Sequence, residues 1–286
     1  MARSDIAIIT DSTCDIPPEL IAKYAIQVVP QIVIWGNQDF RDRVSLQPQE
    51  FYEKLQKEAV RPTSAAATIQ DFEFAYQNAL QNGAVEALVL TVSAAMSGTY
   101  QNALNAIERT SLKAQAVDSR GPTMSLGWQV LAAARCREAG GDLEDMVSAT
   151  NNVRGTLAQI VGMDTIDYLQ RGGRIGGAAK WVGSLLQVRP VVAINHSTGL
   201  VEPAGLARTH SKMVEMVYQK FFEKMKRAGR LHIAVLHGNA IDEAEQLAER
   251  IRQEYEPAEL LINITGPVLG INTGPNAIAL CGYIET

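Results

Sequence analysis

Near its N-terminal end the chain carries the stretch Ile6-Ala7-Ile8-Ile9-Thr10-Asp11-Ser12-Thr13-Cys14-Asp15-Ile16-Pro17. Its apolar first part is typical of a strand that is buried on both faces in a parallel sheet. The polar residues that follow predict a loop, and Pro17 predicts the start of a helix. The stretch therefore indicates one strand-loop-helix unit of an α/β protein.

The first half of the chain repeats this alternation of apolar strand and helix. Strands are expected at residues 87–91 and 114–117, and residues 26–35 are expected as a strand interrupted by Pro30. Helices are expected over about 47–58, 68–82, 123–139 and 142–152. Strand–helix alternation of this kind predicts parallel βαβ units. We therefore expect residues 1–155 to form an N-terminal three-layer α/β/α domain with a parallel sheet.

The pattern changes after Gly155. A strand at 156–163 and a hairpin of 191–194 with 200–203 are expected here. Further strands are expected at 231–236, 260–264 and 278–283, with helices at about 209–227 and 242–252. Strands that are joined by hairpins as well as by helices predict a mixed sheet. Residues 156–286 are therefore expected to form a C-terminal α/β domain of different topology.

Composition and charge exclude several classes of protein. The net charge is −5, from 26 Lys and Arg against 31 Asp and Glu, so the basic excess of a nucleic-acid binder is missing. Cys14, Cys136 and Cys281 lie far apart without a C-x-x-C, which predicts neither disulfides nor a zinc ribbon. The sequence shows no signal-peptide pattern and no run of 18 apolar residues. We expect a cytoplasmic chain without stable membrane insertion.

The sequence signatures of common catalytic sites are missing. There is no G-x-x-x-x-G-K-[ST], no H-E-x-x-H and no G-x-S-x-G. Of the four histidines only His232 and His237 are close together, and their odd offset in a predicted strand places them on opposite faces. We therefore expect no metal site, no cofactor and no catalytic nucleophile.

Short polar side chains instead follow the predicted strands of the first half. They are Asp11, Ser12, Thr13, Thr63, Ser64, Ser93, Ser97 and Thr99. Ligands bind outside the carboxyl ends of parallel strands, so these loops can bind a carboxylate or a phosphate. The same residue types are also common helix caps, and for each of them that interpretation stays open. Arg171 and Arg174, in a glycine-rich stretch, are candidates for phosphate binding or for solvated surface residues.

Taken together in order, several motifs resemble the DegV family of bacterial fatty-acid-binding proteins, which includes the lipid-binding subunits of fatty acid kinase. The motifs cover nearly the whole chain. They are Thr10 to Pro17, Pro62-Thr63-Ser64, Ser93 with Ser97-Gly98-Thr99-Tyr100-Gln101, Asp164 with Tyr168-Leu169-Gln170-Arg171-Gly172-Gly173-Arg174-Ile175, Ala207-Arg208-Thr209, and Gly270-Ile271-Asn272-Thr273-Gly274-Pro275.

The resemblance implies that a long-chain fatty acid is buried in a tunnel and that hydroxyl groups bind its carboxylate. It places Thr63 and Ser93 at the carboxylate, with Ser64, Asn272 and Thr273 beside them. It makes Ser97, Arg174 and Arg208 further contacts to the head group or to the phosphate of a partner. The partner that it implies is the catalytic subunit of a fatty acid kinase, and the chain itself is then no enzyme.

The chain departs from the family at Asn272, where histidine is usual, and an asparagine cannot exchange a proton near pH 7. Two alternatives therefore stay open. One is an enzyme that acts on a small phosphorylated or carbonyl compound in a cleft, with His237 or Asp11 as the base. The other is a ligand sensor that takes no part in phosphate transfer.

Overall fold

The predicted first strand, β1 (Ile6–Asp11), lies inside a four-stranded parallel sheet. Its neighbours are β2 (Ile26–Val29) on one side and β6 (Glu86–Thr91) on the other, and β7 (Lys113–Asp118) completes the order β2-β1-β6-β7. A computed structural model describes residues 5–181, 188–226 and 228–285. All pairs of this sheet are parallel, which confirms the fold class expected for the first half.

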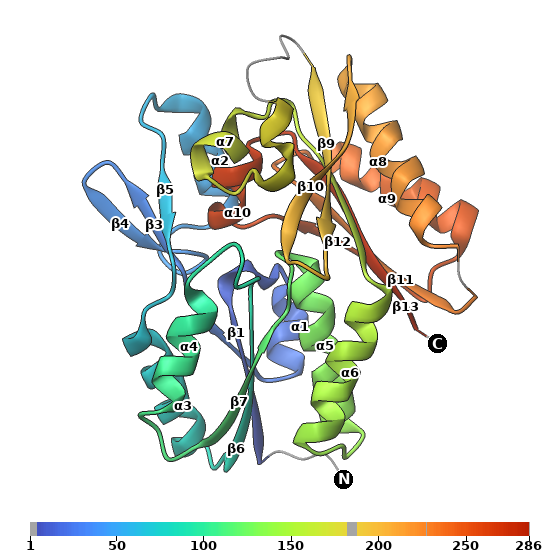
Figure 1. Ribbon diagram of the computed structural model, residues 1–286. Coiled ribbons are helices and arrows are strands. Elements are labelled where there is room, and N and C mark those ends of the chain that lie inside the picture. The colour runs from blue at the N-terminus through green and yellow to red at the C-terminus, as the bar shows by residue number, and fades with distance from the viewer. Residues whose placement is uncertain (1–4, 182–187, 227, 286) are drawn as a thin grey trace.

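Helices cover both faces of the parallel sheet, because its strands are apolar on both sides (Figure 1). On one face, α3 (Ile69–Gln81) and α4 (Thr99–Ile107) pack against Ile9 and Val89. On the other face, α1 (Pro18–Lys23), α5 (Met124–Glu138) and α6 (Leu143–Thr156) pack against Ile8 and Leu88. Thr68 caps α3 in a reciprocal capping box with Asp71. The predicted α/β/α sandwich is therefore present.

The second sheet has six strands in the order β10-β9-β8-β13-β11-β12. The strands are β8 (Ala158–Gly162), β9 (Arg189–Asn195), β10 (Leu200–Ala207), β11 (Arg230–His237), β12 (Glu259–Ile264) and β13 (Ile278–Glu285). Only β11 and β12 are parallel, and the other neighbours are antiparallel. This is the mixed sheet that the hairpins predict. Its outer face packs against α8 (His210–Lys224) and α9 (Ile241–Tyr255).

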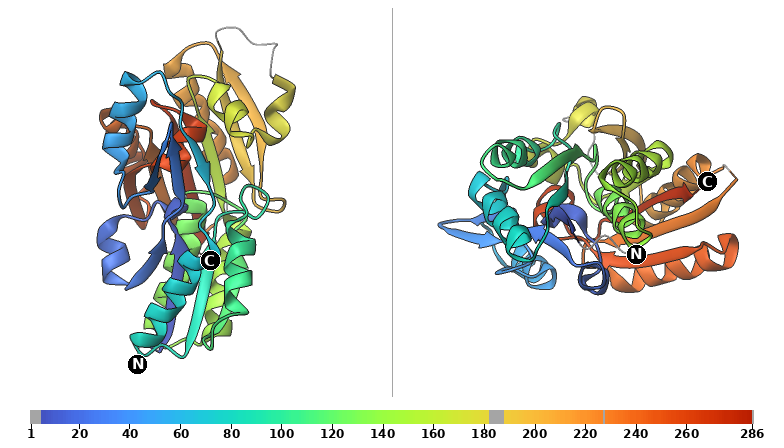
Figure 2. Two further views of the ribbon diagram at one scale, coloured as in Figure 1. Left: turned by 90° about the vertical axis from the view of Figure 1, so that its left-hand side faces the viewer. Right: turned by 90° about the horizontal axis from the view of Figure 1, so that it is seen from below.

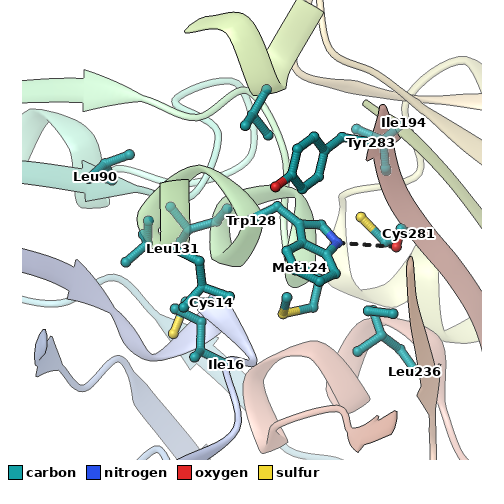
Figure 3. Packing of buried hydrophobic residues seen from close by; sticks show 14 of the residues in the cluster. Cys14, Ile16, Leu90, Met124, Trp128, Leu131, Ile194, Leu236, Cys281 and Tyr283 are labelled. Carbon is teal, nitrogen blue, oxygen red and sulfur yellow. Dashed lines mark hydrogen bonds between the residues drawn. The ribbon is translucent and has the colours of Figure 1, made fainter. Parts of the chain in front are cut away.

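Helix α5 lies between the two sheets and joins them (Figure 3). Eleven of its fifteen residues are buried, so it has no solvent-facing polar side of the usual kind. Trp128 packs against Tyr283 and donates a hydrogen bond from Nε1 to the Cys281 carbonyl oxygen at 3.2 Å. On the opposite side of α5, Cys14 and Ile16 belong to the same apolar cluster. The inner face of the mixed sheet is thereby held against the N-terminal half.

A third, small sheet is absent from the sequence prediction. Residues 26–35 do not form one strand: β2 ends at Val29, and β3 (Ile32–Trp35) belongs to the order β4-β3-β5 with β4 (Gln38–Arg41) and β5 (Thr63–Ala65). Pro30 has no N–H for the parallel ladder, so the chain leaves the first sheet there. The polar residues that follow Trp35 form β4.

This small sheet and α2 (Pro48–Lys57) pack against the C-terminal half. Val33 and Trp35 share an apolar cluster with Val268 and Ile271, which belong to α10 (Pro267–Thr273). Helix α7 (Asp167–Gly172) also belongs to this half, and a separate 3-10 segment, Gly176–Trp181, follows it. The left view of Figure 2 shows the parallel sheet at the end where the N-terminus lies and the mixed sheet at the other. The predicted boundary at residue 155 falls within the last turn of α6 and stays a prediction.

Candidate functional site

An apolar row across the mixed sheet forms the floor of a cavity. The strand register places Leu236 beside Ala279, Ala279 beside Val161, and Val161 beside Val192. All four line a space of about 920 Å³, which includes its solvent-open part and lies between this sheet and the N-terminal loops.

The cavity also extends along β8. Gln159, Val161 and Met163 all line it, because alternate residues of a strand face the same side. At about 3.3 Å per residue, these three residues span roughly 13 Å. Leu169 of α7 and Arg174 also line the cavity. The cavity therefore extends along β8 as well as across the strands of the apolar row.

Apolar side chains also form the opposite wall. Ala65 is the last residue of β5 and Ala66 follows it, and Val92 and Met96 follow β6, so these residues lie at the carboxyl ends of N-terminal strands. Val268 and Leu269 of α10 close a third side. Such a lining favours an apolar ligand, since burying apolar surface is worth about 25 cal/mol per Å².

Polar side chains gather at the mouth. Ser64 and Arg174 line both this cavity and a second hollow of about 620 Å³ on its outer side. Arg174 donates from Nε to the Met96 carbonyl at 3.0 Å and from Nη1 to the Gly172 carbonyl at 2.6 Å, which fixes its guanidinium while Nη2 stays available. Within the described part of the chain, Arg174 is the one cationic residue in the cavity lining.

The structure brings five of the eight predicted contacts together. These five, which line the cavity, are Ser64, Ser97, Arg174, Asn272 and Thr273. The other three lie elsewhere: Thr63 lines only the second hollow, and exposed Arg208 lines neither. Ser93 is fully buried, and its hydroxyl donates to the Gly199 carbonyl at 2.8 Å. The ligand-binding roles of all eight residues stay predictions.

Close packing accounts for one glycine of the glycine-rich motif. Asn272 donates from Nδ2 to the Val268 carbonyl at 2.9 Å, and its Oδ1 faces Gly172. A Cβ at Gly172 would lie 2.1 Å from this oxygen, so any other residue would displace the Asn272 side chain. The glycine therefore keeps Asn272 at the mouth beside Arg174.

A sequence model described as that of uncharacterised proteins of the DegV family matches residues 5–285. The chain belongs to the DegV family. A DegV domain-containing protein of Clostridium acetobutylicum is 32% identical over 286 residues, which cover 98% of each chain. The resemblance seen in the motifs is therefore confirmed.

Solved DegV structures share the whole fold. The structure described as DegV, a fatty acid binding protein from Bacillus subtilis, superposes with a TM-score of 0.90 at 26% identity and covers 98% of this chain and 99% of its own. A structure that describes the fatty acid binding of a DegV family protein from Thermus thermophilus superposes with a TM-score of 0.89 at 29% identity. The superposition covers 100% of this chain and 100% of the other. No helix among residues 5–181, 188–226 and 228–285 has the length and hydropathy needed to cross a membrane.

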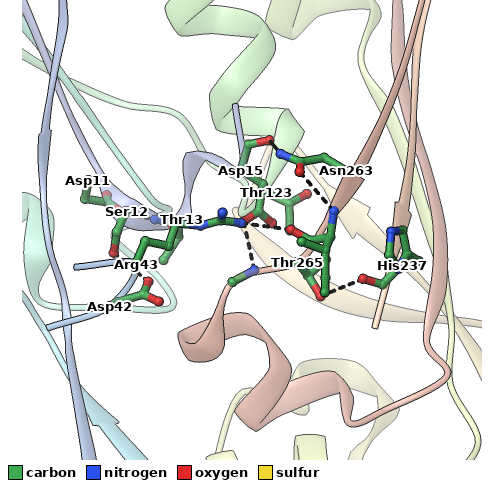
Figure 4. A network of polar contacts seen from close by, with 12 residues as sticks. Asp11, Ser12, Thr13, Asp15, Asp42, Arg43, Thr123, His237, Asn263 and Thr265 are labelled. Carbon is green, nitrogen blue, oxygen red and sulfur yellow. Dashed lines mark hydrogen bonds and ion pairs between the residues drawn. The ribbon is translucent and has the colours of Figure 1, made fainter. Parts of the chain in front are cut away.

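Behind the cavity, this DegV chain buries a network of charged residues that its sequence did not point to (Figure 4). Arg43 donates to Asp15 at 2.5 Å and to the Ile264 carbonyl at 2.9 Å, so it joins the N-terminal half to β12. Asp42 accepts from the Ser12 hydroxyl at 2.6 Å. Ser12 belongs to the opening motif, but Asp42 and Arg43 lie in a stretch whose polarity indicates only a surface loop. The opening motif therefore also helps to hold the two halves together.

The buried carboxyl of Asp42 predicts a pH dependence of stability. Burial raises its pKa to about 7, although neighbouring Arg43 lowers it and Asp15 opposes Arg43. In the unfolded chain the pKa is about 3.9, so the folded state binds the proton more tightly and loses stability as pH rises from about 4 to 7. Between pH 8 and pH 6 this group should add about 1 kcal/mol to the free energy of unfolding.

Urea unfolding of the parent and of Asp42→Asn at both pH values measures this contribution. We expect the difference in pH dependence to be about 1 kcal/mol. Asp39→Asn, which changes an exposed carboxyl of β4, is the matched control and should behave like the parent. Equal pH dependence in the parent and in Asp42→Asn would show that Asp42 is ionised throughout this range.

Proposed function

We propose that this chain binds a long-chain fatty acid, with the acyl chain over the apolar row of the mixed sheet and the carboxylate at Arg174. The observation that carries the proposal is the apolar cavity, in whose lining Arg174 is the one cationic residue among those that the structure describes. Fatty acid binding by the Bacillus subtilis and Thermus thermophilus proteins of the same fold supports it. A chain of about 14 buried methylenes gains roughly 11 kcal/mol, which is enough for tight binding.

The carboxylate needs polar partners, because burying it unpaired would cancel much of this gain. Ser64 is suited to this role, since its hydroxyl has no hydrogen-bond partner among the described residues and lies where the two hollows meet. Arg174 would supply the positive charge, and Asn272 lines the same cavity. Thr63 and Ser93 remain the contacts that the family resemblance implies.

Ser64→Ala should weaken palmitic acid binding about ten- to a hundredfold, the loss expected for one hydrogen bond to a charged group. Isothermal titration of delipidated protein measures this loss. Ser211→Ala, an exposed position at the start of α8, is the matched control. An unchanged dissociation constant for Ser64→Ala would remove Ser64 from the site. The double variant Thr63→Val with Ser93→Ala tests, by the same titration, the two carboxylate contacts that the family resemblance implies.

We also propose that the bound acid is presented to the catalytic subunit of a fatty acid kinase. The second hollow supports this, because Arg61, Arg171 and Arg174 line it directly outside the mouth, where an incoming phosphate would pass. Incubation of the loaded protein with ATP and such a subunit should yield acyl phosphate, and Asn272→His should raise the yield. Retained lipid without any acyl phosphate would favour a ligand sensor instead.

The observed contacts favour binding over chemistry in the cavity. His237 accepts the Ala240 N–H at its Nδ1 and does not line the cavity. The Asp11 carboxylate accepts from Thr13, Gln31 and Val92, and it likewise lies outside the lining. Neither proposed base therefore faces the space that would hold a substrate.

A further inference from the structure

Two neighbouring side chains of the cavity wall, Thr123 and Gln159, carry hydrogen-bond donors that no group of the described chain uses. The Gln159 amide is held on both sides, because its Oε1 accepts from the Ser125 hydroxyl at 2.5 Å and its Nε2 donates to the Thr123 hydroxyl oxygen at 2.9 Å. The second N–H of Gln159 and the hydroxyl proton of Thr123 then have no acceptor among the described residues. Both residues line the cavity, and less than a tenth of each is exposed.

The hydrogen bonds behind this pair run in one direction, toward the cavity. Ser125 gives its single hydroxyl proton to Gln159, so in its contact of 2.8 Å with His196 Nε2 the histidine donates. The His196 ring is neutral, because burial lowers its pKa to about 4. Each group thus accepts from the one behind it and donates to the one in front. Hydrogen bonds aligned in this way polarise one another, so the two donors at the cavity favour a negatively charged acceptor.

The register of the mixed sheet places this pair on the same part of the wall as Arg174. It puts Gln159, Ile194 and Val201 in one row across β8, β9 and β10, and all three line the cavity. The row is about 10 Å wide, since neighbouring strands lie about 4.8 Å apart. Gly176 packs on its end, because a Cβ there would lie 2.4 Å from the Val201 carbonyl oxygen. Arg174, two residues before Gly176, is therefore held beside this row.

A second set of contacts joins Arg174 to the loop between β7 and α5, which carries the free hydroxyl. Arg174 donates to the carbonyl of Met96 in the loop after β6, and Ser93 of that loop donates to the Gly199 carbonyl. A Cβ at Gly199 would lie 3.5 Å from the Cα of Arg120, so the two backbones are close neighbours. Both sets of contacts bring the cation and the two free donors into the same region of the cavity.

Two free donors and a nearby cation suit a carboxylate. Its oxygens only accept hydrogen bonds, and bonds to a charged group are the stronger kind. The one charged side chain in the described part of the lining is Arg174, which matches an anion in sign. An ester or an alcohol can accept from one of the donors, but it gives Arg174 no charge to pair.

We propose that Thr123 and Gln159 bind the carboxylate of the ligand together with Arg174, and that these three residues select free fatty acids over esters and alcohols of the same chain length. This inference rests on the proposed function and adds to it the residues that recognise the head group. Thr123 and Gln159 donate to the carboxylate oxygens, and Arg174 supplies the positive charge.

Titration of delipidated protein with palmitic acid and with methyl palmitate tests the proposal. Thr123→Val keeps the shape of the side chain and removes the hydroxyl. It should weaken palmitic acid binding about ten- to a hundredfold and methyl palmitate binding only about threefold, because the ester oxygen is an uncharged acceptor. Thr123→Ser should bind both ligands like the parent. Thr150→Val, a buried threonine of α6 outside the lining, is the matched control.

A double variant tests whether Thr123 and Arg174 bind the same carboxylate. Groups that act on one charge are coupled, so their losses do not add. Thr123→Val should therefore weaken palmitic acid binding at least about threefold less in the Arg174→Met background than in the parent.

The outcomes separate this inference from the proposed function. If the parent binds palmitic acid but Thr123→Val has unchanged affinity for it, loses acid and ester equally, or shows losses that simply add to those of Arg174→Met, the shared carboxylate site is wrong and fatty acid binding stands. A parent that binds neither acid nor ester would refute the proposed function and this inference with it. Should Thr123→Val not fold, Thr123→Ala removes the same hydroxyl and should show the same difference between acid and ester.

Discussion

Replacing Ala279 by phenylalanine should lower the affinity for palmitic acid at least a hundredfold. Ala279 lies in the middle of the apolar row, between Leu236 and Val161, and faces the cavity. A ring at this position would occupy the space of about four methylenes of the acyl chain, which costs about 3 kcal/mol of binding free energy. Titration of delipidated protein with palmitic acid measures the loss.

The fold should survive this substitution, because the ring enters space that is empty without ligand rather than a packed core. Thermal unfolding of the unliganded variant should therefore give a Tm no lower than that of the parent. Ala279→Ser, which keeps the side chain small, should bind palmitic acid within about tenfold of the parent. Palmitic acid binding that is unchanged in Ala279→Phe would show that the acyl chain does not cross the mixed sheet.

Arg174→Met should weaken palmitic acid binding by about ten- to a hundredfold, since a hydrogen bond to a charged group contributes about 1.5–3 kcal/mol. The methionine keeps much of the apolar stem and removes the charge. Binding of methyl palmitate should stay the same in the parent and in the variant, because the ester has no charge for Arg174 to pair. The comparison of acid and ester therefore isolates the head-group interaction.

Arg109→Met is the control for this experiment. Arg109 is exposed, pairs with Glu73 on α3 and lies outside both hollows. It should bind acid and ester like the parent. A similar loss for acid and ester in Arg174→Met would mean that Arg174 shapes the mouth without contacting the carboxylate. If Arg208→Met lost affinity for palmitic acid and Arg174→Met did not, the carboxylate would instead be bound by Arg208, as the family resemblance implies.

The elements of this fold could largely be predicted from local sequence. The run at β1, the capping threonine of α3 and the hairpin of β9 and β10 are each determined by neighbouring residues. The split at Pro30 was the main error, because an apolar run continues on both sides of it although the two parts enter different sheets. The small third sheet depends on packing against α10, which no local pattern shows.

The candidate site could be predicted less completely, since it depends on distant parts of the chain. The motifs gave Ser64, Arg174 and Asn272, which the fold brings to one mouth. The apolar row could not be predicted, because it follows from the register of four strands. Gln159, in an otherwise apolar strand, was a further signal in the sequence. Its role could not be predicted, because its partners Thr123 and Ser125 approach it only in the folded protein.

Native mass spectrometry of freshly purified protein, followed by extraction and fatty-acid analysis, tests the central claim most directly. Binding energies of the size estimated above retain a ligand through purification. We predict one long-chain acid of about 14–18 carbons per chain, and Ala279→Phe purified in the same way should carry none. An empty parent protein that also takes up no added palmitic or oleic acid would contradict fatty acid binding.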